Sequence, residues 1–124
     1  MKKYLFRGWD ATGQKGWVYG DLVHNQKVTK TGLEPRVMVG GYEVVPESVG
    51  MDSNLKDRKH KDIFEGDILA IYYNGKLLFN ATVIWHDKFA SFLMDEGDEN
   101  CYSPIPYETE IEVIGNIYEK NLKK

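Results

Sequence analysis

The sequence contains very little cysteine and proline and no long hydrophobic run. A single cysteine, Cys101, excludes an internal disulfide and any multi-cysteine zinc or iron–sulfur centre. The longest apolar runs, such as 68–73, are far too short to span a bilayer. Arg7 and Asp10 interrupt the amino-terminal stretch where a signal peptide would carry its apolar core. We therefore expect a protein of the reducing cytoplasm that has no membrane partner.

The chain also lacks the short motifs that mark common enzymes. It contains no glycine-rich phosphate loop, no Gly-x-Ser-x-Gly and no His-Glu-x-x-His. Its 124 residues are 42% hydrophobic and 13% aromatic, which is enough to bury a core and is not typical of disorder. The composition predicts one domain or two closely packed subdomains that bind no cofactor.

No strong excess of one charge is present, since the net charge is −3. The first 62 residues carry 11 basic and 8 acidic side chains, whereas the last 62 carry 5 and 11. This balance disfavours a nucleic-acid footprint over the whole surface. The asymmetry between the halves could steer a charged partner, or it could be incidental.

Strand signals fill the first half of the chain. They predict strands over 4–9 and 16–23 that pair antiparallel, and two short strands, 36–39 and 42–45, joined at Gly40-Gly41. Residues 24–34 are polar and are predicted to form a long surface excursion. Residues 46–49 are predicted to form a single helical turn that starts at the proline.

The second half is more regular, and its turns suggest a barrel. Predicted strands cover 67–73, 76–86, 89–94 and 110–118, and Asn74-Gly75 favours a type I′ turn between the first two. Strands at this spacing, joined by tight turns, are typical of an SH3-like barrel. We therefore expect an all-β protein, with an irregular amino-terminal β subdomain (1–62) that includes a charged connecting loop and a carboxy-terminal SH3-like barrel (63–124).

Several blocks of sequence also carry a family resemblance. They are Phe6-Arg7-Gly8-Trp9-Asp10, Tyr42 to Gly50, Leu55-Lys56-Asp57, Ile63 to Ile68 and Val113 to Glu119. Together they resemble, in the same order and over nearly the whole chain, the YopX family of phage and prophage proteins. The chain departs from that family's pattern at 51–54 and 58–60. The resemblance implies a β-rich fold, a bacterial host and a phage-encoded origin, and it implies no particular biochemical activity.

Two blocks offer candidate functional side chains. Glu65 and Asp67 flank Gly66, a spacing that could serve acid–base chemistry, although a glycine with positive φ and an aspartate bound to turn amides explain it better. Arg7 and Trp9 lie on one face of a predicted strand, where they could form a recognition surface or pack inward.

The remaining metal-ligating and nucleophilic side chains form no recognisable site. The acidic loop at 95–99 lacks the ligand spacing of a calcium-binding EF-hand. The histidines, His24, His60 and His86, lack metal-ligand spacing, and Cys101 has no histidine near it in sequence. We expect no metal site and no catalytic residue here.

A cluster of cations is the one local feature suited to nucleic acid, because such clusters release counterions from phosphates. Its members are Lys56, Arg58, Lys59 and Lys61, which we call the basic loop, and two aspartates interrupt it. Three hypotheses follow. The leading one is a non-enzymatic interaction or assembly protein that binds a second copy or a phage or host protein. The alternatives are a nucleic-acid-binding module that uses the basic loop and an enzyme with an unfamiliar site at Glu65 and Asp67.

Overall fold

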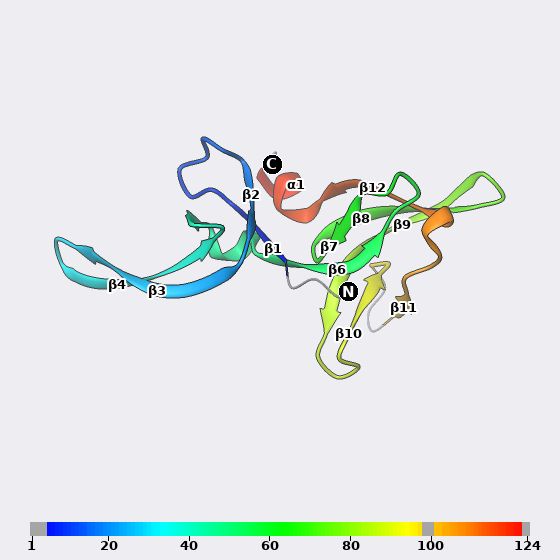
Figure 1. The fold of residues 1–124 in the computed structure, drawn as a ribbon. Helices are drawn as coiled ribbons and strands as arrows, with labels where there is room; N and C mark the ends of the chain where they lie inside the picture. The colour runs from blue at the N-terminus through cyan, green and yellow to red at the C-terminus, as the bar shows by residue number, and fades with distance from the viewer. Residues whose placement is uncertain (1–4, 98–100, 123–124) are drawn as a thin grey trace. The chain divides into compact units, whose positions relative to one another are not determined.

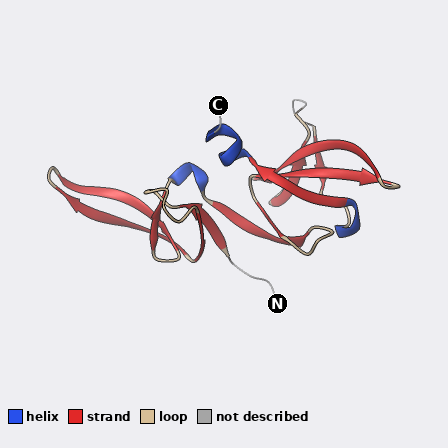
Figure 2. Ribbon diagram, turned by 90° about the horizontal axis from the view of Figure 1, so that it is seen from above, coloured by secondary structure: helices blue, strands red, loops and turns tan. Residues whose placement is uncertain are grey.

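The computed structural model describes residues 5–97 and 101–122 and consists mainly of antiparallel strands (Figures 1 and 2). The strands are β1 (Phe6–Trp9), β2 (Trp17–Gly20), β3 (Leu22–Thr29), β4 (Gly32–Val39), β5 (Tyr42–Val44), β6 (Gly50–Lys56), β7 (Asp62–Phe64), β8 (Asp67–Tyr73), β9 (Lys76–His86), β10 (Ser91–Asp95), β11 (Tyr102–Pro104) and β12 (Ile111–Asn116). The helices are two 3₁₀ turns, η1 (Pro46–Ser48) and η2 (Glu108–Glu110), and the short α1 (Ile117–Leu122). The all-β prediction is confirmed, and none of the described helices is long and apolar enough to cross a membrane.

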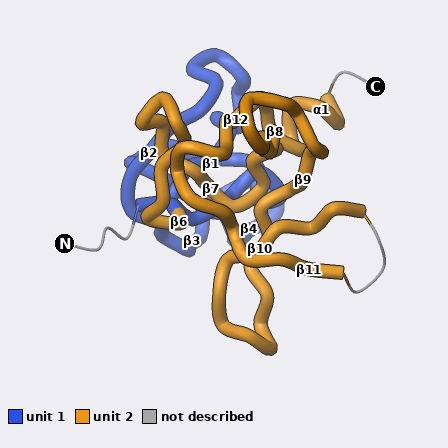
Figure 3. The backbone as a smooth tube through the Cα atoms, turned by 90° about the vertical axis from the view of Figure 1, so that its right-hand side faces the viewer, with its two compact units in different colours: residues 1–52 blue, residues 53–124 orange. Residues whose placement is uncertain are grey.

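The chain divides into two compact units, Met1–Asp52 and Ser53–Lys124, which Figure 3 shows in different colours. The sequence placed the division ten residues later, after residue 62. Contacts within the second unit explain the difference. The Ser53 hydroxyl donates a hydrogen bond to the Ile63 carbonyl at 2.6 Å, and the Arg58 N–H donates to the Ile111 carbonyl at 2.9 Å. The charged segment therefore belongs to the second unit instead of linking the two.

The first unit is built around a small apolar core. As predicted, β1 and β2 pair antiparallel, with Trp9 opposite Trp17. The buried members of the core are Val18, Val39 and Val44, and Phe6, Leu22, Val37 and Val49 pack against them. A Cβ added at Gly8 would lie 2.8 Å from side-chain atoms of Val44, so the backbone of β1 approaches this core closely because it carries no side chain there.

The predicted strand over 16–23 is interrupted, which corrects the expectation of one continuous strand. Gly20 has a φ of 148°, and a Cβ on it would lie 2.7 Å from the Cα of Gly40. This close approach of two backbones is possible only between glycines. The chain changes direction at Gly20, and β3 begins at Leu22 in a separate three-stranded sheet of order β3-β4-β5.

Residues 24–34 lie at the surface, as predicted, but they are not an excursion that precedes the strands. These residues form most of a long hairpin, β3–β4, which extends from the rest of the first unit (Figure 1). Its register is continuous from the pair Leu22 and Val39 to the pair Thr29 and Gly32. Most side chains on both faces of the hairpin are exposed, so polar residues are tolerated at most positions. This part of the sequence therefore lacks the alternation of apolar and polar residues that marks a strand with one buried face.

The second unit contains a five-stranded antiparallel sheet of order β11-β10-β9-β8-β12. The bounds of β8 and β9 agree with the prediction, and the positive φ values of Asn74 (49°) and Gly75 (79°) fit the predicted type I′ turn. The buried core consists of Ile63, Leu69, Ile71, Ala81, Val83, Met94 and Ile111. The described strands form open sheets, so the SH3-like barrel is not confirmed.

The last predicted strand, 110–118, is too long. β12 ends at Asn116, and the chain continues as α1. The Asn116 side chain accepts a hydrogen bond from the Glu119 N–H at 2.8 Å and donates one to the Glu119 carboxylate at 3.3 Å. This reciprocal arrangement resembles a helix capping box, and the Asn-x-x-Glu spacing could have revealed it.

Candidate interaction surfaces

The basic loop is held in place by a buried aspartate. Asp57 is only 1% exposed, and its carboxylate accepts hydrogen bonds of 2.9 Å from the N–H groups of Lys59, Lys61 and Val113. Burial by itself would raise the pKa of the Asp57 carboxyl, but these hydrogen bonds and the nearby Lys61 charge together lower it. Because Val113 lies in β12, the loop is fixed to the sheet of the second unit.

Two cations of the basic loop are bound to one carboxylate on β12. The Arg58 guanidinium lies 2.8 Å from a Glu112 carboxylate oxygen, and the Lys59 ammonium lies 3.6 Å from the same atom. The Arg58 guanidinium also stacks over the Tyr72 ring, 4.1 Å from its centroid. Glu112 therefore partly neutralises the positive charge of Arg58 and Lys59 that would otherwise attract a phosphate group.

The other end of the basic loop is paired in the same way. Lys56 forms an ion pair with Asp62, and the exposed His60 ring lies 3.1 Å from Glu108. Lys61 is the loop cation that makes no ion pair with any described residue. The structure thus brings the predicted cations together but surrounds them with carboxylates, which weakens the case for a nucleic-acid interface.

The Glu65-Gly66-Asp67 turn has the structural role that the sequence favoured. Gly66 has a φ of 92°, and the buried Asp67 carboxylate accepts a hydrogen bond from the Phe64 N–H at 2.8 Å. The Gly66 N–H also donates to the Val83 carbonyl at 2.8 Å, which ties the turn to β9. Neither of the two cavities described below is lined by Glu65 or Asp67.

Arg7 and Trp9 both contact Trp17, as the alternation of β1 predicts. The Arg7 guanidinium lies 4.5 Å from the Trp17 ring centroid, and the two tryptophan rings meet edge to face at 5.4 Å. Arg7 is only 6% exposed. Its cation is therefore part of the packing of the first unit, and it is not available on an exposed recognition surface.

The acidic loop is only partly described, because Asp98 and Glu99 lie outside the described residues. Asp95 accepts a hydrogen bond from the Gly97 N–H at 2.8 Å, and Glu96 accepts one from the Ser103 hydroxyl at 3.0 Å. Both are ordinary turn and loop contacts. Within 5–97 and 101–122, no three histidine, cysteine or acidic side chains are grouped to hold a metal ion.

Sequence reasoning missed one feature, the outer edge of β3. The Gly40 N–H donates a hydrogen bond to the Asp21 carbonyl, just before β3. Hydrogen-bonded pairs occur at every second position of an antiparallel ladder, so the odd-numbered residues of β3 are the ones whose backbone groups bond to β4. The backbone N–H and C=O groups of His24, Gln26 and Val28 therefore point away from β4. No other described strand pairs with β3 in its sheet.

The hairpin also has two different faces. On one face, Arg36 donates to the Asn25 side chain at 2.7 Å and Lys27 pairs with Glu43 at 3.0 Å. On the other face, Val28 lies opposite Leu33, and these side chains are 84% and 64% exposed. In β4, apolar residues and proline recur at every second position from Leu33 to Val39, and this pattern could have revealed a strand there; β3 shows no such alternation.

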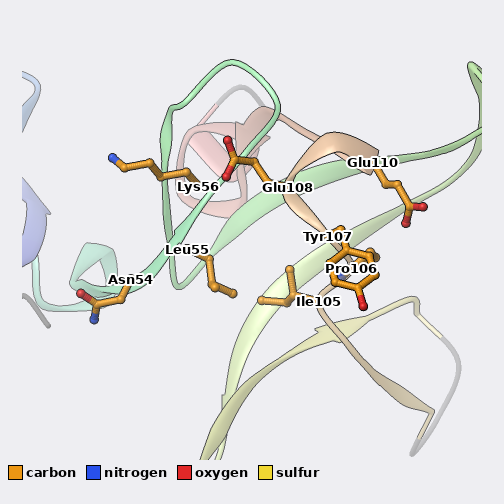
Figure 4. Close-up of a pocket in the computed structure, with 8 residues that line it drawn as sticks. All are labelled: Asn54, Leu55, Lys56, Ile105, Pro106, Tyr107, Glu108 and Glu110. Carbon is orange, nitrogen blue, oxygen red and sulfur yellow. The ribbon is translucent and has the colours of Figure 1, made fainter. Parts of the chain in front are cut away.

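The second unit carries two concave regions. The larger is a groove of about 720 Å³ lined by Asn54, Leu55, Lys56, Ile105, Pro106, Tyr107, Glu108 and Glu110 (Figure 4). The smaller, of about 250 Å³, is bordered by Asn80, Asp95, Glu96 and Lys120 together with neighbouring residues. Neither cavity collects the side chains of a recognisable catalytic group.

Comparison with known proteins gives a family and no molecular role. No curated protein matches the chain. The family model described as YopX protein matches residues 5–122, a range that includes parts of both units and every block of sequence that carried the resemblance. The chain therefore belongs to the YopX family.

Proposed function

We propose that this protein is a non-enzymatic assembly protein that associates with a second copy of itself through the outer edge of β3. We further propose that it is phage- or prophage-encoded and acts in the cytoplasm of a bacterial host. The observation that carries the proposal is the row of backbone groups on His24, Gln26 and Val28, which has no partner strand within 5–97 and 101–122. Such an edge is a template for another strand.

The edge of β3 lacks the features that usually protect an exposed strand. Edge strands are commonly protected by proline, by bulges or by charged side chains. The register of β3 is continuous, it contains no proline, and its one lysine, Lys27, is held by Glu43. By contrast, the outer edge of β4 carries Pro35, which removes one hydrogen-bond donor. The two edges of the same hairpin thus differ in their capacity to pair.

A second copy fits this edge without a charge conflict. If the two β3 strands pair antiparallel about Asn25, then Val28 lies opposite Leu22 of the second copy, and His24 lies opposite Gln26 of the second copy. Lys27 then lies opposite Val23 of the second copy, so like charges do not face each other directly. This register also brings the exposed Val28 side chain beside an apolar neighbour.

The test is light scattering coupled to size-exclusion chromatography of the full chain. We expect a dimer for the unmodified protein and a monomer for Gln26→Pro, because proline removes the outward N–H of Gln26 and leaves the bonds from β3 to β4 in place. Gln26→Ala is the matched control. It keeps the backbone N–H and should remain a dimer.

A second variant separates loss of pairing from loss of the hairpin. Val28 is 84% exposed, so Val28→Lys should leave the first unit folded. It should nevertheless weaken the dimer, because it replaces the apolar contact with Leu22 of the second copy by a charge. An unmodified protein that is monomeric at all concentrations tested would overturn the proposal, as would a Gln26→Pro variant that stays dimeric.

A further inference from the structure

The groove of the second unit lies between the end of β6 and the segment that precedes η2 (Figure 4). One wall is the end of β6, at Asn54, Leu55 and Lys56. The other is the segment from Ile105 to Tyr107, which lies outside the named strands and reaches an extended conformation at Tyr107, with φ −61° and ψ 149°. Asn54 bends the first wall with a positive φ of 66°, and a cleft that runs between a strand end and a second stretch of chain suits a short peptide segment better than a compact ligand.

Half of the residues that line the groove are apolar, and two of these are well exposed. Tyr107 is 84% exposed and Leu55 is 43% exposed, although both are large hydrophobic side chains. In Figure 4 the Leu55 side chain points toward Ile105, and Tyr107 and Pro106 stand beside them. The volume of about 720 Å³ lies within the range of ligand-binding clefts. Exposed aromatic and aliphatic side chains in such a cleft supply contact area for a partner.

The charges around the groove favour a cationic partner. Lys56 is offset by Asp62, and Glu108 faces the exposed His60 ring. The Glu110 side chain makes no ion pair with any described residue. The rim therefore carries the Glu110 carboxylate without an ion-pair partner among the described residues, beside the apolar side chains of Ile105, Pro106 and Tyr107.

We propose that this groove binds an extended peptide segment that places an apolar side chain between Leu55 and Tyr107 and a lysine or arginine at Glu110. The apolar anchor gains contact area with the tyrosine ring, and the cation meets the half-buried Glu110 carboxylate. The site is separate from β3, so this proposal does not depend on the self-association proposed above.

The experiment is a selection from a library of random short peptides displayed on phage, with the full chain immobilised as the target. We expect enriched sequences to share an apolar residue at a fixed distance from a lysine or arginine. The most enriched peptide is then synthesised with a fluorescent label, and its dissociation constant is measured by fluorescence polarisation for the protein and its variants.

Four variants distinguish the groove from the rest of the surface. Tyr107→Ala should weaken binding about tenfold, because it removes a central aromatic contact. Glu110→Gln should weaken it about threefold, because it removes one partner of an ion pair near the surface. The matched controls, Tyr73→Ala and Asp87→Asn, change an exposed tyrosine and an exposed aspartate outside the groove and should bind as the unmodified protein does.

A loss of peptide binding can be distinguished from a loss of folding. Tyr107 is exposed, so its replacement should leave the circular dichroism spectrum and the thermal midpoint unchanged, and a loss of binding then reports the contact itself. The proposal is overturned if no sequence is enriched, if the enriched sequences lack the cation, or if Tyr107→Ala binds the selected peptide as tightly as the unmodified protein.

Discussion

The two long hairpins of this protein, β3–β4 and β8–β9, have similar strand pairing and turns, but β8–β9 contributes to a buried core and β3–β4 is largely exposed. Both have a continuous or nearly continuous antiparallel register and a tight turn. β8 and β9 are each flanked by a further strand, and Leu69 and Val83 on them are at most 1% exposed. In β3–β4, Val28 and Leu33 at the far end are 84% and 64% exposed.

The difference shows that hairpin formation and core formation are separate properties of a sequence. A tight turn and cross-strand pairs are enough to define a hairpin, but a two-stranded hairpin is only marginally stable unless another layer or strand covers it. β8–β9 obtains that cover from β10 and β12. β3–β4 has only the short β5 beside it, so one edge and one apolar surface remain for a partner.

The largest expected difference in stability is between leucine-to-alanine substitutions in the two hairpins. Leu69→Ala in β8 should lower the free energy of unfolding by about 3 kcal/mol, because it removes a buried side chain and leaves a cavity. Leu33→Ala in β4 should change it by less than about 0.5 kcal/mol, because that side chain is already exposed. Urea denaturation followed by circular dichroism measures both. Equal losses would contradict the assignment of β3–β4 as an uncovered hairpin.

A smaller but substantial effect is expected at the buried carboxylate of the second unit. Asp57→Ala should cost about 2 kcal/mol, because it removes the acceptor of three backbone N–H groups, including that of Val113 in β12. Asp87→Ala is the control, because Asp87 is exposed, and it should cost less than about 0.5 kcal/mol. Urea denaturation is again the measurement, and a neutral Asp57→Ala would show that the basic loop is not held by this side chain.

The same carboxylate should make stability depend on pH. The pKa of Asp57 is lower in the folded protein than its ordinary value of 3.8, so the unfolded chain binds more protons just below pH 4. The stabilisation is complete above that ordinary pKa and is lost as the pH falls through the folded pKa. Asp10 in the first unit has a pKa lowered mainly by hydrogen bonds from Thr12, so it contributes in the same direction.

Denaturation midpoints measured between pH 2 and pH 6 check this prediction. The unmodified protein should lose stability as the pH falls below about 4, and Asp57→Asn should show a shallower loss because the Asp10 contribution remains. A variant whose pH profile runs parallel to that of the unmodified protein would contradict the role given to Asp57.

The smallest effect is expected at the basic loop. Replacing Lys56, Arg58, Lys59 and Lys61 together by glutamine should leave any affinity for short duplex or single-stranded DNA unchanged, because Asp62 and Glu112 already bind three of these four side chains. Fluorescence polarisation at low and moderate salt measures the affinity. Salt-dependent binding that the fourfold variant loses would favour the nucleic-acid alternative over the assembly proposal.

The parts of the fold that were predicted correctly are those with strong local signals. Asn74-Gly75 specifies a turn by its backbone preferences alone. The apolar run of β8 on one side and the alternating burial of β9 on the other reinforce the strand pattern. The role of Gly66 and Asp67 was predicted for the same reason, since a glycine with positive φ and an aspartate bound to a turn amide are local features.

The parts that were missed depend on contacts between residues distant in sequence. The break at Gly20 arises from its approach to Gly40, and the boundary of the second unit depends on Arg58 reaching Ile111. The candidate cations of the basic loop were identified, but their neutralisation by Glu112 could not be, because that partner lies 54 residues away from Arg58. A single sequence carries no signal for such pairs.

The most direct test of the central claim is amide hydrogen exchange on β3 as a function of protein concentration. In a single copy, the N–H groups of Asn25 and Lys27 bond to β4 and those of Gln26 and Val28 do not. We expect the first pair to be protected at every concentration and the second pair to become protected only as the concentration rises. Exchange at Gln26 and Val28 that stays fast at all concentrations would contradict self-association through the edge of β3.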